Sequence, residues 1–170
     1  MILNWYGEGC FRIQSGDLDI LIDPFESGVG LTPPRFKASL VIKTLAKSSL
    51  EGKEEEGMVL KGAGDYEING AEIKGFQAGG SNEDFLKTIY ILNLEGLKIG
   101  VLGYLEEIPE SDVEDVLSGL DILIIPAGGG PFLEVSEAVK LVKKLGAKII
   151  IPSFFKDFRG ISGIGKKMKN

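Results

Sequence analysis

The chain has 170 residues, of which 44% are hydrophobic and 26% charged, an ordinary balance for one globular domain with a sizeable core. No apolar run approaches the roughly 18 residues that a membrane-spanning helix needs, and a single cysteine, Cys10, excludes an internal disulfide. The N-terminus lacks the basic start and apolar stretch of a signal peptide, so we expect a cytoplasmic protein with no membrane partner.

The net charge of −6 is distributed unevenly along the chain. Residues 156–170 carry a net charge of +4, which leaves −10 on the rest. An acidic body argues against nucleic acid as a partner. We therefore expect one domain over residues 1–155 and a solvated basic tail over 156–170, with anion or nucleic-acid contact by this tail as a minor alternative.

The first part of the chain predicts strands and hairpins. Short apolar or alternating runs are separated by glycine, asparagine and proline signals, and Asn69-Gly70 indicates a type I′ turn. Strands are expected at Ile2–Tyr6, Cys10–Gln14, Leu18–Ile22, Leu40–Thr44, Met58–Lys61, Tyr66–Ile68, Ala71–Phe76, Thr88–Leu94 and Leu97–Leu102. A short polar loop is expected to follow Thr44.

Helices appear only in the later part of the sequence. A capping box at Ser111 and Glu114 opens the first helix, and Pro131 can open a second helix that Gly146 ends. Continuous apolar runs at Ile122–Ile125 and Lys148–Ile151 predict strands buried on both faces. Strands followed by a β-α-β-α-β order predict an α/β (α+β) protein in which helices cover sheets.

Several fragments together resemble a known family. They are Gly7-Glu8-Gly9-Cys10-Phe11, Ile22-Asp23-Pro24-Phe25, Ala63-Gly64-Asp65-Tyr66-Glu67, Lys87-Thr88-Ile89-Tyr90 and the segment Asp121–Gly129. Their order and spacing resemble the metallo-β-lactamase superfamily, in its small branch of zinc-dependent hydrolases that includes the ascorbate-phosphate lactonases. This resemblance implies a metallo-β-lactamase-like αβ/βα sandwich of two mixed β-sheets covered by helices, and a zinc-dependent hydrolase.

The metal ligands of that family do not carry over, because the chain contains no histidine. After a strand ending in Thr44, the positions of the family's His-x-His-x-Asp-His motif are taken by Leu45, Lys47, Ser49 and Leu50. The family's later His-Leu-Gly-Asp motif is Val101-Leu102-Gly103-Tyr104 here, and Phe154 stands at the last histidine.

These replacements predict a metal site that has been lost as a unit. Zinc hydrolysis needs nitrogen or carboxylate ligands with an open position for water, and apolar replacements remove the polar groups together with the metal. We expect Phe154 and Leu50 to fill the former cleft. The sequence then favours a zinc-free pseudoenzyme without cofactor, a binding or structural module whose partner is an unidentified protein or a second copy in a homo-oligomer.

A hydrolase with a non-classical site is the alternative. The carboxylates Asp23, Asp65 and Glu107 could hold Mg²⁺ or Mn²⁺ through oxygen, although Asp23 before Pro24 also suits a turn cap. Lys47 and Tyr104 could face a phosphorylated or lactone-like small molecule. Cys10 is expected to be a small core thiol, since no histidine can serve it as a base.

Overall fold

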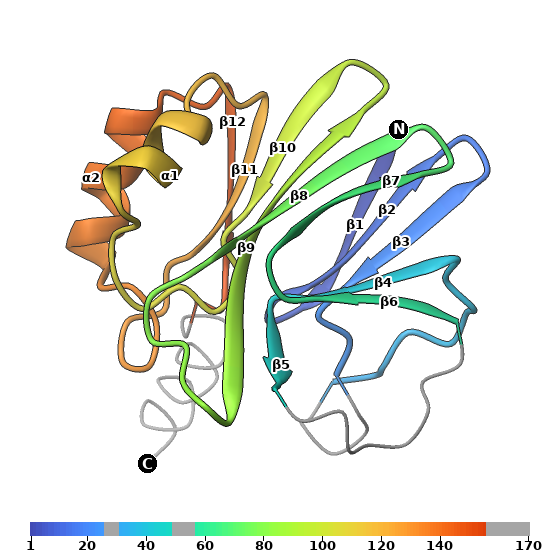
Figure 1. Ribbon diagram of the computed structural model, residues 1–170, viewed down its shortest axis with the longest axis horizontal. Coiled ribbons are helices and arrows are strands. Elements are labelled where there is room, and N and C mark those ends of the chain that lie inside the picture. Colours follow the sequence, from blue (N-terminus) through green and yellow to red (C-terminus); the bar gives the residue numbers. More distant parts are fainter. Residues whose placement is uncertain (26–30, 49–56, 156–170) are drawn as a thin grey trace, which may run out of the picture.

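The computed structural model describes residues 1–25, 31–48 and 57–155, which form twelve strands and two helices (Figure 1). The earlier strands are β1 (Ile2–Gly7), β2 (Cys10–Ser15), β3 (Leu18–Ile22), β4 (Leu40–Lys43), β5 (Leu45–Lys47) and β6 (Met58–Lys61). They are followed by β7 (Gly64–Ile68), β8 (Ala71–Gln77), β9 (Phe85–Leu94), β10 (Leu97–Val101), α1 (Ser111–Val116), β11 (Ile122–Pro126), α2 (Val135–Leu145) and β12 (Ile149–Ser153).

The strands form two mixed sheets, as the resemblance implies. The five-stranded sheet has the order β1-β2-β3-β4-β6, and the seven-stranded sheet has the order β12-β11-β10-β9-β8-β7, with β5 pairing β9. Strands β3, β4 and β6 run parallel, as do β10, β11 and β12, whereas the hairpins are antiparallel. The parallel strands therefore point their carboxyl ends toward one edge of each sheet.

Two hydrophobic cores account for the sequence patterns. The core between the sheets contains Ile20 and Ile42 from the five-stranded sheet and Leu92 from β9. The second core joins the other face of the seven-stranded sheet to helix residues such as Leu141 and Leu145. Alternate residues of β2 and β3 enter the first core, whereas β11 is buried along its whole length because both of its faces are covered.

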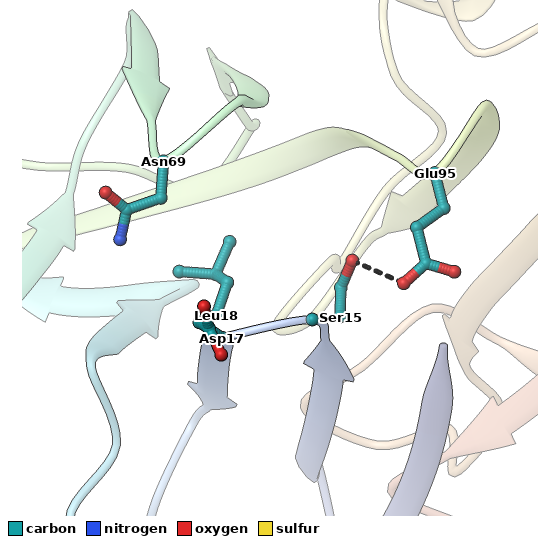
Figure 2. A pocket seen from close by; sticks show the side chains of 6 residues that line it. Ser15, Asp17, Leu18, Asn69 and Glu95 are labelled. Carbon is teal, nitrogen blue, oxygen red and sulfur yellow. Dashed lines mark hydrogen bonds between the residues drawn. The ribbon is translucent and has the colours of Figure 1, made fainter.

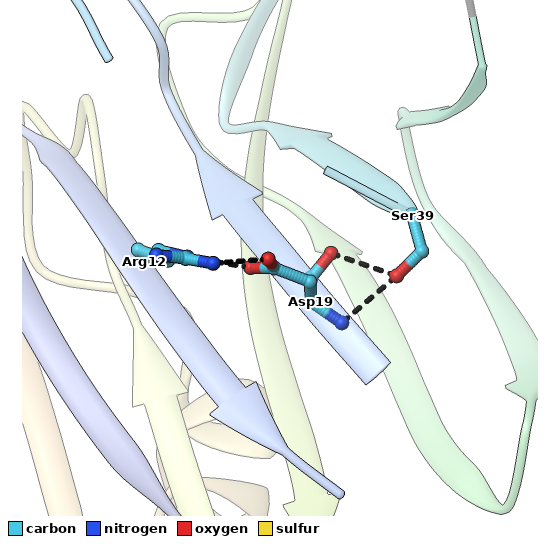
Figure 3. A network of polar contacts seen from close by, with 3 residues as sticks. All are labelled: Arg12, Asp19 and Ser39. Carbon is cyan, nitrogen blue, oxygen red and sulfur yellow. Dashed lines mark hydrogen bonds and ion pairs between the residues drawn. The ribbon is translucent and has the colours of Figure 1, made fainter. Parts of the chain in front are cut away.

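A polar network holds the outer face of the five-stranded sheet to the segment that leads into β4 (Figure 3). Arg12 donates hydrogen bonds from Nε and Nη2 to the two carboxylate oxygens of Asp19, at 2.8 and 2.5 Å. The Ser39 hydroxyl accepts from the Asp19 N–H at 2.8 Å and donates to the Asp19 carbonyl at 3.0 Å. The Arg12 guanidinium also lies 3.9 Å from the ring centroid of Phe36. These contacts fix where β4 begins.

Both helices lie on the outer face of the seven-stranded sheet, so helix cover is confined to that sheet in the described part of the chain (Figure 1). The predicted capping box at Ser111 is wrong, because Glu110 precedes the first turn and makes no side-chain cap hydrogen bond. Pro131 does not open α2, which begins at Val135. The predicted end at Gly146 is confirmed by its left-handed conformation, with a φ of 63°.

Two stretches differ from the predicted strands. The loop expected after Thr44 contains the short strand β5, in which Leu45 pairs with Lys87 of β9. The apolar run predicts a buried last strand, but β12 is an edge strand among the described strands, and Ile149 is 54% and Ile150 44% exposed. An apolar run is compatible with a central or an edge strand, because its sequence alone does not show how many strands will pair with it.

The other predicted strands are confirmed, with ends shifted by at most a few residues. The type I′ turn is confirmed as well, with φ angles of 50° at Asn69 and 79° at Gly70. Neither helix of the described residues has the length and apolar character needed to cross a membrane.

Candidate functional site

The carboxyl ends of the parallel strands of both sheets meet at one end of the sandwich. The sheets are bonded to each other here, because the Thr88 N–H donates to the Thr44 carbonyl at 2.8 Å and the Phe154 N–H donates to the Glu8 carbonyl at 3.3 Å. Active sites of open α/β sheets form where strand ends meet in this way. The strand-end cluster, as we call it, consists of Glu8, Cys10, Asp23, Thr44, Gly103, Tyr104, Phe132 and Phe154.

A paired carboxyl and hydroxyl form the polar part of the strand-end cluster. Thr44, at the end of β4, donates its N–H to Asp23 Oδ1 at 2.7 Å and its hydroxyl to Asp23 Oδ2 at 2.5 Å. The Asp23 N–H donates in turn to the Ile42 carbonyl at 2.9 Å, and Asp23 adopts a φ of 44°. Both carboxylate oxygens therefore already accept hydrogen bonds within the protein.

The Asp23 side chain is partly buried. Burial raises its pKa to about 7, and the two hydrogen bonds from Thr44 and the charge of Lys43 oppose that increase only partly. At neutral pH the group is divided between its neutral and ionised forms. A carboxyl in this state is a poorer metal ligand than a solvated one, because a metal must first displace its proton.

Close packing leaves little space around Thr44. Its side chain is fully buried, and Gly103 lies against it with a φ of +47°. A Cβ on Gly103 would overlap the Thr44 side chain, and most residues with a side chain would also be strained at this φ. The turn after β10 therefore seals one side of the Asp23–Thr44 pair.

Three aromatic rings close the other side of the strand-end cluster. The ring of Phe154 lies 4.7 Å from that of Tyr104 and 4.5 Å from that of Phe132, measured between centroids. Tyr104 and Phe132 are 5.6 Å apart, so each ring touches the other two. Only 6% of Phe154 is exposed. These three side chains, the aromatic plug, fill space with apolar surface.

The backbone of Phe154 adopts a conformation that is unfavourable for a bulky residue. Its φ is 51°, in the left-handed region. The surrounding glycines fit its shape, because a Cβ on Gly9 would overlap the Phe154 ring and one on Gly128 would overlap its carbonyl oxygen. A strained residue persists where its neighbours over-determine it. Packing therefore holds Phe154 in place.

Cys10 and Tyr104, two further groups of the strand-end cluster, favour their neutral forms. Burial, followed by the nearby charge of Asp23, raises the pKa of Cys10 to about 12, against an opposing hydrogen bond from the Phe25 backbone. Burial, then the charges of Asp23 and Glu8, also raises the pKa of Tyr104 to about 12. Neither group supplies a thiolate or phenolate near neutral pH.

The positions predicted as a degenerate metal site do not all lie together. Val101 is buried in the core between the sheets, 1% exposed, and Leu45 lies on β5. Lys47, on the same strand, is exposed. Ser49 and Leu50 lie outside the described residues. Among the described members of this set, Tyr104 and Phe154 meet in the strand-end cluster.

The predicted carboxylate ligands are not brought together. Asp65 is exposed on β7 opposite Lys74, and the exposed Glu107 lies beside Gly79. Within the described ranges, no three His, Cys, Asp or Glu side chains are grouped so that they could hold a metal ion. The groups near Asp23 include the Thr44 hydroxyl, the Tyr104 phenol and the Cys10 thiol, whose pKa is raised to about 12, and this set does not fit zinc.

Sequence reasoning missed two features of the strand-end cluster. The sequence suggests a metal ligand or a turn cap at Asp23, but its carboxylate accepts hydrogen bonds from Thr44, which is 21 residues away in the chain. Phe132 follows the glycines Gly128–Gly130 and had no motif to mark it. No periodicity links residues that meet only through strand order, so these contacts required the fold.

A hollow lies at the opposite end of the sheets, where three hairpin turns come together (Figure 2). Its volume is about 560 Å³. Glu95 accepts hydrogen bonds from the Ser15 hydroxyl and the Met1 amino group, both at 2.8 Å. The amino group's hydrogen bond is the main cause that lowers the pKa of Glu95. The lining residues are Ser15, Gly16, Asp17, Leu18, Asn69 and Glu95.

Two mixed sheets in a sandwich, with helices on an outer face and a cluster at the strand ends, define a protein of the metallo-β-lactamase fold. The sequence profile of the Beta-lactamase superfamily domain (Lactamase_B_3) matches residues 2–153, and the chain belongs to this family. A comparison with curated proteins gave no match.

Solved structures agree with this assignment. A candidate Zn-dependent hydrolase of the superfamily from Thermotoga maritima has a TM-score of 0.75 at 25% identity, over 91% of this chain and 75% of that one. A candidate metal-dependent hydrolase from Parabacteroides distasonis has a TM-score of 0.65 at 20% identity, over 91% and 82%. Igni18, a metallo hydrolase from Ignicoccus hospitalis, has a TM-score of 0.67 at 16% identity, over 89% and 81%. The last two share the fold.

Proposed function

We propose that this protein is a zinc-free member of the metallo-β-lactamase superfamily that acts as a non-catalytic binding or structural module. One observation carries the proposal, namely the aromatic plug at the strand ends. Phe154 occupies the position that the resemblance assigns to a histidine ligand, and its ring is packed between Tyr104 and Phe132. A metal-bound water and its substrate would need the space that these rings fill.

The electrostatics of the strand-end cluster support the same proposal. Burial raises the pKa of Tyr104 to about 12, so its phenol stays protonated near neutral pH, and both carboxylate oxygens of Asp23 already accept hydrogen bonds from Thr44. Lys47, which stands at the second histidine position of the motif, is exposed on β5. The absence of histidine ligands and the packing of the strand-end cluster therefore both support a non-catalytic protein.

Metal binding to purified, untagged protein tests this proposal. We expect metal well below one equivalent by elemental analysis, and no shift in thermal midpoint when Zn²⁺, Mn²⁺ or Mg²⁺ is added, because a ligand that bound the native state would stabilise it. A His-tag must be absent, since it would supply the histidines that the chain lacks.

A near-stoichiometric metal would overturn the proposal if its binding is lost in Asp23→Asn but kept in Asp65→Asn. Both substitutions remove one carboxylate, but Asp23 lies in the strand-end cluster and Asp65 is exposed on β7. That result would support the alternative, a metal-dependent hydrolase with a non-classical site for a phosphorylated or lactone-like small molecule. Turnover of a panel of phosphate esters and lactones would then define its substrate.

A further inference from the structure

Hydroxyl side chains gather where the core between the sheets meets the strand-end cluster. Four polar or charged residues of the described chain are buried, and three of them carry a hydroxyl, namely Thr44, Thr88 and Ser153. Each stands two residues from a side chain that packs in this core, respectively Ile42, Tyr90 and Ile151. Side chains two residues apart along a strand lie on the same face. The three hydroxyls therefore continue the inner faces of the sheets toward the strand ends.

Two of these three hydroxyls have a partner within the protein. Thr44 donates its hydroxyl to the Asp23 carboxyl, and the Thr88 side chain forms a hydrogen bond with the Tyr90 hydroxyl. Ser153 differs, because its Oγ is fully buried and has no hydrogen-bond partner among the described residues. Nearly all buried polar side-chain atoms in folded proteins are hydrogen-bonded, either to protein or to ordered water. The exception at Ser153 therefore indicates a partner other than a protein group.

The register of β12 shows where the Ser153 hydroxyl points. Ile151 pairs with Ile124 of β11, and both side chains pack in the core between the sheets. Ser153 is two residues further along β12, so its side chain leaves the same face. The next residue, Phe154, donates its N–H to the Glu8 carbonyl of the other sheet at 3.3 Å. The hydroxyl is therefore directed between the sheets, beside the strand-end cluster, and not toward the helices.

The chemistry of this position favours a small neutral partner that both donates and accepts hydrogen bonds. A buried ion would need an opposite charge to compensate for its lost hydration, whereas a water molecule needs two to four polar partners and about 30 Å³. A serine is smaller than the isoleucines that precede it on the same face, which is compatible with that volume. Asp23, Cys10 and Tyr104 of the strand-end cluster carry polar groups that can supply the further hydrogen bonds.

We propose that the Ser153 hydroxyl binds one internal water molecule between the sheets, beside the strand-end cluster. This water satisfies the buried hydroxyl and joins β12 to the polar groups at the ends of the other strands. The site goes beyond the proposed function and does not depend on it, because a serine hydroxyl is not a usual zinc ligand. The aromatic plug, with Phe154 only 6% exposed, covers this end of the sandwich and shields the water from exchange with solvent.

A crystal structure of the untagged full chain at about 1.5 Å resolution tests the proposal, with a chelator present so that a metal cannot be mistaken for the water. We expect one ordered water within about 3 Å of Ser153 Oγ. Ser153→Ala should lower the thermal midpoint by about 2 to 4 °C, because the water then loses one of its hydrogen bonds. Ser136→Ala, at an exposed position on α2, removes the same hydroxyl elsewhere and should change the midpoint by less than about 1 °C.

Three results would overturn the proposal. The first is a structure without a water at Ser153 Oγ. The second is a Ser153 hydroxyl that is bonded to another protein group. The third is a Ser153→Ala variant whose thermal midpoint equals or exceeds that of the wild type, which is the result expected for a dry hydroxyl without a partner, since its removal ends an uncompensated burial. Far-UV circular dichroism of both variants checks that the fold is retained.

Discussion

The two ends of the sandwich treat their carboxyl groups in opposite ways. At the strand-end cluster, burial raises the pKa of Asp23 to about 7. At the hairpin end, hydrogen bonds from the Met1 amino group and the Ser15 hydroxyl lower the pKa of Glu95. The comparison shows that burial determines the pKa at the end of the sandwich where the strands terminate, whereas hydrogen bonds determine it at the hairpin end.

Backbone strain separates the same two ends. Asn69 and Glu95 adopt positive φ in tight turns, each followed by a glycine. In the strand-end cluster, Glu8 likewise adopts positive φ in a turn before Gly9, but Asp23 and Phe154 adopt it without such a turn, with φ angles of 44° and 51°. Packing must stabilise Phe154, since a bulky side chain is disfavoured at positive φ, whereas aspartate tolerates it better. Substitutions at the two ends should therefore differ in cost.

The largest effect is expected from removal of the Phe154 ring. Phe154→Ala should lower the free energy of unfolding by about 3 to 5 kcal/mol, because it leaves a cavity between Tyr104 and Phe132. Phe154→Gly makes the same cavity but relieves the positive φ, so it should be no less stable than the alanine variant. Urea unfolding measures both. A loss below about 1 kcal/mol in either would contradict the packed plug.

Substitution of one glycine at each end of the sandwich compares the two ends directly. Gly103→Ala should cost about 2 kcal/mol or more, because its Cβ would overlap Thr44 and its φ is +47°. Gly96→Ala, at the hairpin end, has a φ of +76° but no atom within 4 Å of the added Cβ, so only the backbone cost of about 1 kcal/mol applies. Equal thermal midpoints for the two variants would mean that the turn after β10 is not tightly packed.

The Asp23 carboxyl should make the protein less stable as pH rises from about 4 to about 7. Its pKa is raised in the folded state, from 3.8 to about 7, so over this window the folded protein binds a proton that the unfolded chain has released. Asp23→Asn should remove this dependence and should match or exceed the wild type above pH 7. Urea midpoints across the window measure it, with Asp65→Asn as the matched control at an exposed site.

The smallest effect on stability is expected at Glu95, and its pH dependence has the opposite sign to that of Asp23. Its pKa is lowered by its partners, so its contribution is present above the pKa of the unfolded chain and is lost as pH falls through the lower folded value. Glu95→Gln should reduce stability slightly at neutral pH and not at all in strong acid, and added salt should diminish the difference. A variant that is destabilised most in acid would contradict the assigned pairing.

Local patterns in the sequence predict most of the fold. Alternation in β2 and β3, the Asn69-Gly70 turn and the apolar run of β11 each reflect a period or a backbone preference that acts over a few residues. The errors occur where neighbours decide the outcome. β12 is an apolar run like β11 but lies at the edge of the described sheet. Ser111 is a residue type that often caps helices, but Glu110 occupies the cap position.

The strand-end cluster is only partly predictable for a related reason. The absence of histidine is visible in the sequence, and so is Phe154 at a ligand position. The contacts of Phe154 with Phe132 and of Asp23 with Thr44 join distant segments, and they depend on strand order and on glycines small enough to permit close approach.

The single cysteine of the chain gives this protein a built-in reporter. Cys10 is completely buried, and its raised pKa keeps the thiol unreactive while the strand ends remain closed. A thiol reagent will therefore modify the protein only through an opening event that admits water to β2. The labelling rate, followed against reagent concentration, measures how often this edge of the sandwich opens and how quickly it closes, without any introduced probe.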